Sequence, residues 1–192
     1  MKRRTFSRPM GYRRYRKLFI ISCEGKETEI QYFRLIQSYN PEILVDCPTR
    51  NRQSSPFQVL KTLKQRFMEK NPRPPYEAWL VIDKDHWTGV QIDELAKWVD
   101  HHGNRGLAVS NPKFEFWLLL HFKMGNDVHT SRECTIRLQR YLDDFSKHID
   151  PRAITFLESK QPSSTPNCVT ILHVLTGRTI QVLLLYTDWL RE

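Results

Sequence analysis

The sequence predicts an α/β protein built on a mainly parallel sheet that is covered by helices on both faces. Strand-like and helix-like stretches alternate from residue 18 to residue 109, which is the order that right-handed crossovers between parallel strands produce. Residues 78–82 are continuously apolar, and residues 18–23 are apolar apart from Ser22, as strands are when both faces of the sheet are buried. Both stretches end abruptly in acidic residues. We therefore expect acids at the carboxyl edge of the sheet, where open α/β sheets bind ligands.

Four strands are expected, at residues 18–23, 43–47, 78–82 and 106–109. The helix after the first strand has Thr28 as its candidate cap, and the next helix begins at Ser55-Pro56, a cap followed by a proline. A third helix lies between the last two strands and ends near Gly103. In the common flavodoxin-like order the first and third strands are neighbours, so their terminal acids would face each other.

The second half of the chain is expected to be largely helical. Ser110-Asn111-Pro112 repeats the cap-then-proline signal before residues 114–122, which are apolar on every side and must be buried. A further amphipathic helix is marked by Leu138, Tyr141, Leu142 and Phe145, whereas the pattern of residues 169–190 does not decide between helix and strand. We divide the chain into a basic arm at residues 1–17, a core at 18–125 and a C-terminal extension, packed on the core, at 126–192.

Positive charge is concentrated at the start of the chain. The net charge of the 192 residues is +9, and residues 1–17 hold eight basic residues and no acid. Such a block, with Tyr12 and Tyr15 interleaved, suits the phosphate backbone and bases of nucleic acid, although a solvated arm that aids solubility is the alternative. The residues expected to contact nucleic acid are Arg3, Arg4, Arg13, Arg14, Arg16, Lys17 and Lys26.

The cysteines and the hydropathy pattern favour a cytoplasmic protein. Four cysteines lie far apart with no CxxC pair, which is typical of reduced thiols and argues against a zinc site. The apolar stretch after the basic start is too short for a signal peptide and runs into Glu24 rather than a small-residue cleavage site. No uncharged apolar run has the length needed to cross a bilayer, so no membrane partner is expected.

The acids at the strand ends predict a metal site. Asp83 and Asp85 follow the third strand at i and i+2, so both side chains leave it on the same side. Glu24 follows the first strand and would join them at the shared edge. Three carboxylates at close range repel one another unless a cation neutralises them. An all-oxygen site favours Mg²⁺ or Mn²⁺, as one or two ions.

Other charged residues are weaker candidates for the same site. Glu115 is the one acid in a stretch that must be buried, so it needs a partner: an arginine, a helix N-terminus or the metal. Glu29, in the first turn of its helix, has the same alternatives. Lys84 and Lys26 lie close enough to contact a substrate phosphate, although most surface lysines have no such role.

Three sequence blocks resemble RloB-like proteins of bacterial defence loci. They are Cys23-Glu24-Gly25-Lys26-Glu27-Thr28-Glu29, Ile82-Asp83-Lys84-Asp85, and the run from Ser110-Asn111-Pro112 to His121-Phe122. This family looks like a branch of the Toprim superfamily, which implies a three-layer sandwich with a four-stranded central sheet. The resemblance implies that Glu24 is the general acid or base, that Asp83 and Asp85 hold Mg²⁺, and that Glu29 and Glu115 serve a second ion. It also implies a separately encoded ATPase partner.

The leading expectation is a metal-dependent nuclease that hydrolyses DNA or RNA in an anti-phage defence system, with Glu24, Asp83, Asp85 and Lys84 as its catalytic residues. One alternative is a non-catalytic nucleic-acid-binding subunit that works with the ATPase, and a homo-oligomer is possible in either case. A phosphotransferase of the haloacid-dehalogenase type fits poorly, since Trp87 stands where that pattern requires Thr or Val.

Overall fold

The computed structural model describes residues 16–49, 55–84, 87–122, 128, 130–142 and 149. Along these residues the elements are β1 (Lys17–Cys23), α1 (Thr28–Tyr39), β2 (Ile43–Asp46), α2 (Pro56–Lys70), β3 (Tyr76–Asp83), α3 (Gly89–Asp100), β4 (Arg105–Ser110), α4 (Phe114–Leu119) and α5 (Ser131–Leu138). The predicted alternation is confirmed, and each strand begins and ends within two residues of its expected bounds.

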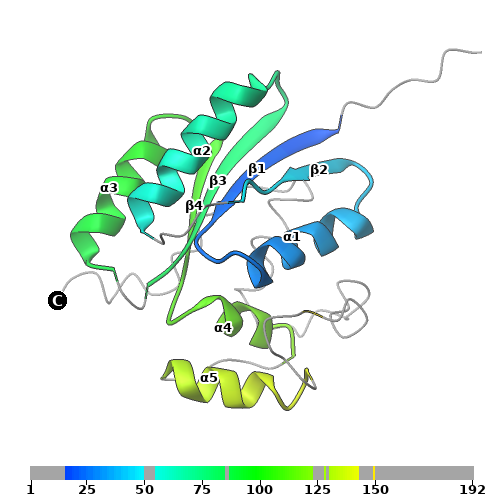
Figure 1. The fold of residues 1–192 in the computed structure, drawn as a ribbon, viewed down its shortest axis with the longest axis vertical. Helices are drawn as coiled ribbons and strands as arrows, with labels where there is room; N and C mark the ends of the chain where they lie inside the picture. The colour runs from blue at the N-terminus through cyan, green and yellow to red at the C-terminus, as the bar shows by residue number, and fades with distance from the viewer. Residues whose placement is uncertain are drawn as a thin grey trace, which may run out of the picture.

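The four strands form one parallel sheet in the order β2-β1-β3-β4 (Figure 1). The predicted adjacency of the first and third strands is therefore confirmed. In the register of β1 and β3, Leu18 lies opposite Tyr76 and Cys23 lies opposite Val81. Because the two strands run in the same direction, their terminal acids leave the sheet at the same edge.

Helices cover both faces of the sheet, which makes the three layers that the sequence predicts (Figure 1). Alternate residues of β1 point to opposite faces, as the pleat requires. Phe19 and Ile21 pack with Tyr32 and Phe33 of α1 on one face. On the other face a second cluster forms around α2 and α3, and it includes Ile20, Val59, Leu63, Leu80, Ile82 and Leu95. Full burial of each side chain of this size contributes about 1.5 to 3 kcal/mol to folding.

The beginnings of α2 and α3 follow simple capping rules. Ser55 caps α2, with its hydroxyl accepting a hydrogen bond from the backbone N–H of Gln58 at 3.2 Å, as predicted from the Ser-Pro signal. Thr88 and Gln91 form a capping box at the start of α3. The expectation for α1 is wrong by one position, because Glu27 holds the N-cap position and Thr28 is already the first helical residue.

The region after β4 differs from its prediction in two ways. The cap-then-proline signal at Ser110-Asn111-Pro112 does not start α4, whose N-cap is Lys113 and whose first helical residue is Phe114. The next helix, α5, ends at Leu138, so it lies before the stretch in which an amphipathic helix was expected. Leu138 and Leu142 are nevertheless buried, whereas Tyr141 is exposed and Phe145 lies outside the described residues.

The helices α4 and α5 contact each other beyond the carboxyl ends of the strands (Figure 1). Phe114, Trp117 and Leu138 belong to the same apolar cluster as α1 and β1. Leu142 and Ile149 belong to this cluster as well. The proposed domain boundaries and the unassigned stretch 169–190 involve residues outside the described part of the chain.

Candidate metal centre

Glu24 and Asp83 meet at the carboxyl edge of the sheet, although 59 positions separate them in the chain. The backbone N–H of Glu24 extends the ladder between the central strands by donating to the carbonyl of Val81 at 2.8 Å. The backbone N–H of Asp83 donates to Glu24 Oε2 at 3.1 Å. The predicted proximity of these two acids is confirmed, whereas Asp85 lies outside the described residues.

The carboxylate of Glu24 is also held by a tryptophan that the sequence analysis did not assign to the site. The indole N–H of Trp87 donates to Glu24 Oε1 at 3.2 Å and to Oε2 at 3.0 Å. Together with the bond from Asp83, these bonds fix the orientation of the Glu24 carboxylate. The position of Trp87, two residues after Asp85, was the available signal.

Glu29 lies at the start of α1 and is almost fully buried, with only 6% of its surface exposed. Its Oε1 accepts a hydrogen bond from the backbone N–H of Gly25 at 3.0 Å. A Cβ at Gly25 would stand 2.0 Å from Glu29 Oε2, so any larger residue here would have to displace the Glu29 carboxylate. Burial raises the pKa of Glu29, and the nearby charges of Glu115 and Glu24 raise it further.

Glu115 extends the same acidic group from the first turn of α4. Its Oε2 lies 4.0 Å from Nζ of Lys113, and that ammonium donates to the hydroxyl of Thr135 at 2.6 Å. The neighbouring Cys134 is buried, and burial raises the pKa of its thiol to about 11, with the charges of Glu115 and Asp83 also raising it. Cys134 is therefore protonated at neutral pH and is a poor metal ligand. Lys113 and Thr135 were not identified from the sequence.

The donor set suits a hard divalent cation, since every acid that meets here offers carboxylate oxygen. The charges of Glu24 and Glu115 both raise the pKa of Glu29, so Glu29 lies within electrostatic reach of both. Among the residues that the structure describes, however, no three His, Cys, Asp or Glu side chains come close enough to hold one metal ion between them. An ion bound here would need Asp85 as well, or a rotation of the described side chains. The metal assignment therefore stays a prediction.

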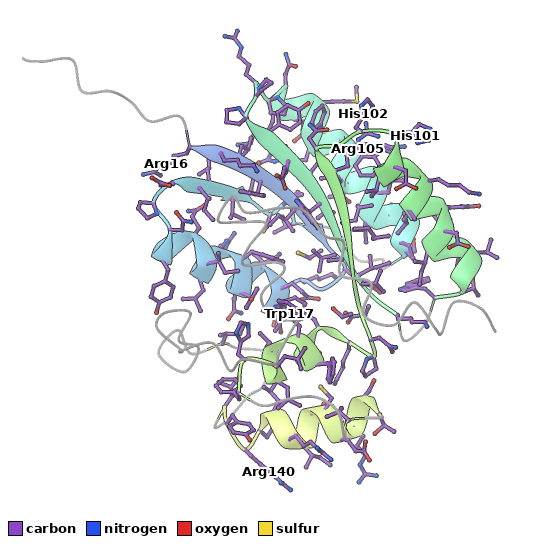
Figure 2. All side chains as sticks on the ribbon, turned by 180° about the vertical axis from the view of Figure 1, so that it is seen from behind. Arg16, His101, His102, Arg105, Trp117 and Arg140 are labelled. Atoms are coloured by element: carbon purple, nitrogen blue, oxygen red, sulfur yellow. The ribbon has the colours of Figure 1, made fainter. Side chains whose placement is uncertain are left out.

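The basic residues that were proposed to contact nucleic acid and that the structure describes lie in two places. Lys17 is at the amino end of β1, where it pairs with the buried Glu77 and lies 5.2 Å from the centroid of the Phe19 ring. Figure 2 shows Arg16 at this amino end of the sheet, while Trp117 of α4 lies toward the opposite end. Lys26 is exposed, two residues after Glu24. Lys84, which was predicted as a catalytic residue and does not belong to this set, is half-buried after β3. The other members of that set, Arg3, Arg4, Arg13 and Arg14, lie outside the described residues.

The position of Lys17 bears on how the basic arm could act. Its ammonium neutralises Glu77, which also accepts a hydrogen bond from the indole of Trp79 at 2.8 Å. This pair lies at the edge opposite to Glu24. Lys17 therefore contributes to the fold, and its proposed contact with nucleic acid would compete with its ion pair to the buried Glu77.

A four-stranded parallel sheet with helices on both faces is the architecture of an α/β protein of the Toprim-like sandwich type. Within that class the chain belongs to the RloB-like protein family, whose model matches residues 19–170. Comparisons with curated proteins and with solved structures gave no match. In the described part of the chain, each helix is too short or too polar to span a membrane.

Proposed function

We propose that this chain is a metal-dependent nuclease that hydrolyses phosphodiester bonds of DNA or RNA as part of a bacterial anti-phage defence system. The observation that carries the proposal is the meeting of Glu24 with the end of β3. The charges of Glu24 and Glu115, which raise the pKa of the buried Glu29, support it. Carboxylates gathered in this way are costly unless a cation offsets their repulsion. An Mg²⁺ or Mn²⁺ ion, when bound, would activate water and stabilise charge on the phosphate and the leaving oxygen.

In this proposal each residue has a distinct task. Glu24 receives the proton of the attacking water, and the N–H groups of Asp83 and Trp87 hold its carboxylate in one orientation for that transfer. Water adds to phosphorus, the bond to the leaving oxygen breaks, and the leaving oxygen takes a proton from solvent water, while Glu24 returns its proton to solvent. The carboxylates of Asp83 and Asp85 would hold the ion, while Glu29 and Glu115 would serve a second one. Lys84 would contact the phosphate that is cleaved.

The proposal is tested by comparing wild type with Glu24→Gln and Asp83→Asn on plasmid DNA and on RNA, with Mg²⁺ or Mn²⁺. We expect each substitution to lower the cleavage rate by about 10²-fold or more, the usual effect of removing a positioned catalytic group. Glu94→Gln is the matched control, because Glu94 is an exposed acid of α3 away from the edge. Equal cleavage by wild type and both variants would contradict the proposal.

A second candidate function is a nucleic-acid-binding subunit without catalysis, which works with a separately encoded ATPase. The observation in its favour is that the described side chains alone do not close a three-ligand metal site. Binding of DNA or RNA that persists in EDTA, combined with no cleavage in the presence or absence of an ATPase encoded beside this chain, would support this function over the nuclease.

A further inference from the structure

A polar cleft of about 650 Å³ lies at the end of the edge strand β2, apart from the acidic group. It is lined by Asp46 and the residues that follow it, by one face of α2, and by Arg34 of α1. The two helices belong to opposite faces of the sheet, so the cleft lies where both reach the edge beyond β2. Its volume falls in the range of about 300 to 1,000 Å³ that is usual for small-ligand sites.

The acids of this cleft are already neutralised. Arg66 donates to both oxygens of Asp46, from Nε at 3.0 Å and from the second guanidinium nitrogen at 3.1 Å. It also donates to Glu69 at 3.2 Å. Lys70 adds a second cation at 3.3 Å from Asp46. The charge of these acids therefore does not repel an anion that enters the cleft, and the pairing holds α2 against the end of β2.

Two further cations line the same cleft without such a role. Arg34 and Lys61 are exposed, and neither forms an ion pair with a residue in the described ranges. They project from different helices, α1 and α2. Since Asp46 and Glu69 are matched by Arg66 and Lys70, the charges of Arg34 and Lys61 are in excess. The cleft is therefore positive when empty.

Neutral hydrogen-bonding groups complete the lining. Thr49 follows β2, and Gln58 and Thr62 lie one turn apart on α2, so they share a helix face. Thr62 donates its hydroxyl hydrogen to the carbonyl of Gln58 at 2.8 Å, which leaves the hydroxyl oxygen able to accept. Hydroxyl and amide groups beside a guanidinium and an ammonium match the phosphate, the sugar hydroxyls and the base edges of a nucleotide.

We propose that this cleft binds the phosphate of a nucleotide, with Arg34 and Lys61 as its two charged contacts. The nucleotide is either a free molecule or one unit of a nucleic-acid strand. Asp46 at the end of β2 is aligned with Ile20 of β1. Cys23, which precedes Glu24, lies three residues further along β1, or about 10 Å at the rise of a β-strand. A nucleic-acid strand bound in the cleft would thus run close to the acidic edge. The binding itself does not require cleavage.

The test measures affinity in EDTA, so that metal-dependent chemistry plays no part. The probes are fluorescent oligothymidylate over a series of salt concentrations and adenosine monophosphate as a competitor. The double variant Arg34→Gln, Lys61→Gln removes the two proposed contacts. The control Lys64→Gln, Arg132→Gln removes one lysine and one arginine that are exposed and do not line the cleft. Both pairs lower the net charge equally.

For the cleft variant we expect at least tenfold weaker binding. A plot of the logarithm of the binding constant against the logarithm of the salt concentration should also have a slope that is smaller in magnitude by about 1.4, because two phosphate contacts on a single nucleic-acid strand are lost. The control should bind as wild type does. Competition by adenosine monophosphate would identify a free nucleotide as a ligand, and its absence would identify a strand. The proposal is wrong if wild type binds neither probe, or if the cleft and control variants weaken binding equally.

This outcome is separable from the nuclease test. Glu24→Gln should keep wild-type affinity in EDTA even when it does not cleave. If the cleft variant binds weakly and wild type does not cleave, the proposed nucleotide binding in the cleft stands and the proposed nuclease activity is wrong.

Discussion

Replacing Gly25 by alanine should destabilise the protein strongly, because Glu29 occupies the space that the new Cβ needs. The Cβ would stand 2.0 Å from Oε2 and 2.1 Å from Oε1 of Glu29, and ordinary contact begins at 3.4 Å, so the carboxylate has to move by about 1.4 Å. That movement also breaks the hydrogen bond from the Gly25 N–H. Overpacking costs about 1 to 3 kcal/mol and the lost bond to a carboxylate about 1.5 to 3 kcal/mol. We expect a loss of about 3 to 5 kcal/mol in the free energy of unfolding.

Urea unfolding followed by tryptophan fluorescence measures this loss. Gly103→Ala is the matched control, because a Cβ there meets no atom within 4 Å. Truncating the Glu29 carboxylate should relieve the clash. The double variant Gly25→Ala, Glu29→Ala should therefore lose about 2 kcal/mol less free energy of unfolding than the sum of the losses in the two single variants. The reasoning is refuted if Gly25→Ala lies within about 0.5 kcal/mol of Gly103→Ala.

The remaining predictions concern charge. Burial raises the pKa of Glu29 above 4.5, so the folded protein holds this proton more tightly than the unfolded chain does. The resulting stabilisation is lost as the pH rises through the folded-state pKa. In metal-free urea titrations Glu29→Gln should therefore gain stability relative to wild type toward neutral pH, and a constant difference would contradict this. Burial lowers the pKa of His121 from 6.5 to about 4, which has the opposite effect: its contribution is complete above pH 6.5 and falls by about 3 kcal/mol as the pH drops to 4. His121→Gln should lose this dependence, and an unchanged pH profile would show that another group causes it. Mg²⁺ at a hundred times its dissociation constant should stabilise wild type by about 2.7 kcal/mol. A thermal melt of Asp83→Asn should show no such gain, and equal gains in both proteins would place the ion elsewhere.

The core of the fold could be predicted from the sequence because its signals are local. Continuous apolar runs mark strands that are buried on both faces, and the Ser55-Pro56 signal marks the start of α2. The same cap-then-proline signal failed before α4, where the helix begins only at Phe114. The prediction for α5 failed because Leu138 and Leu142 are buried at helical spacing although the helix ends at Leu138. Apolar residues beyond the end of a helix can thus be buried at helical spacing although the chain there is no longer helical.

The site could be predicted only in part, for a physical reason. The meeting of Glu24 and Asp83 followed from two strand ends and one assumption about strand order, and the structure has that contact. Trp87 and Lys113 depend on how side chains fold back from a loop and from a helix cap, which no periodic pattern records. The cleft beside β2 was missed because its lining comes from α1 and α2, whose relative position depends on the packing of both faces.

The bond between the Asp83 N–H and Glu24 has a consequence for the order of events during synthesis. It joins residues 59 positions apart, so it requires the pairing of β1 with β3 and the closure of the loop that contains β2 and α2. On the ribosome the first acid emerges long before the second has been added. In a shortened chain that stops before residue 83, the carboxyl edge of the sheet lacks the contact between Glu24 and Asp83. Any chemistry at this edge therefore requires that β3 has been synthesised and paired with β1.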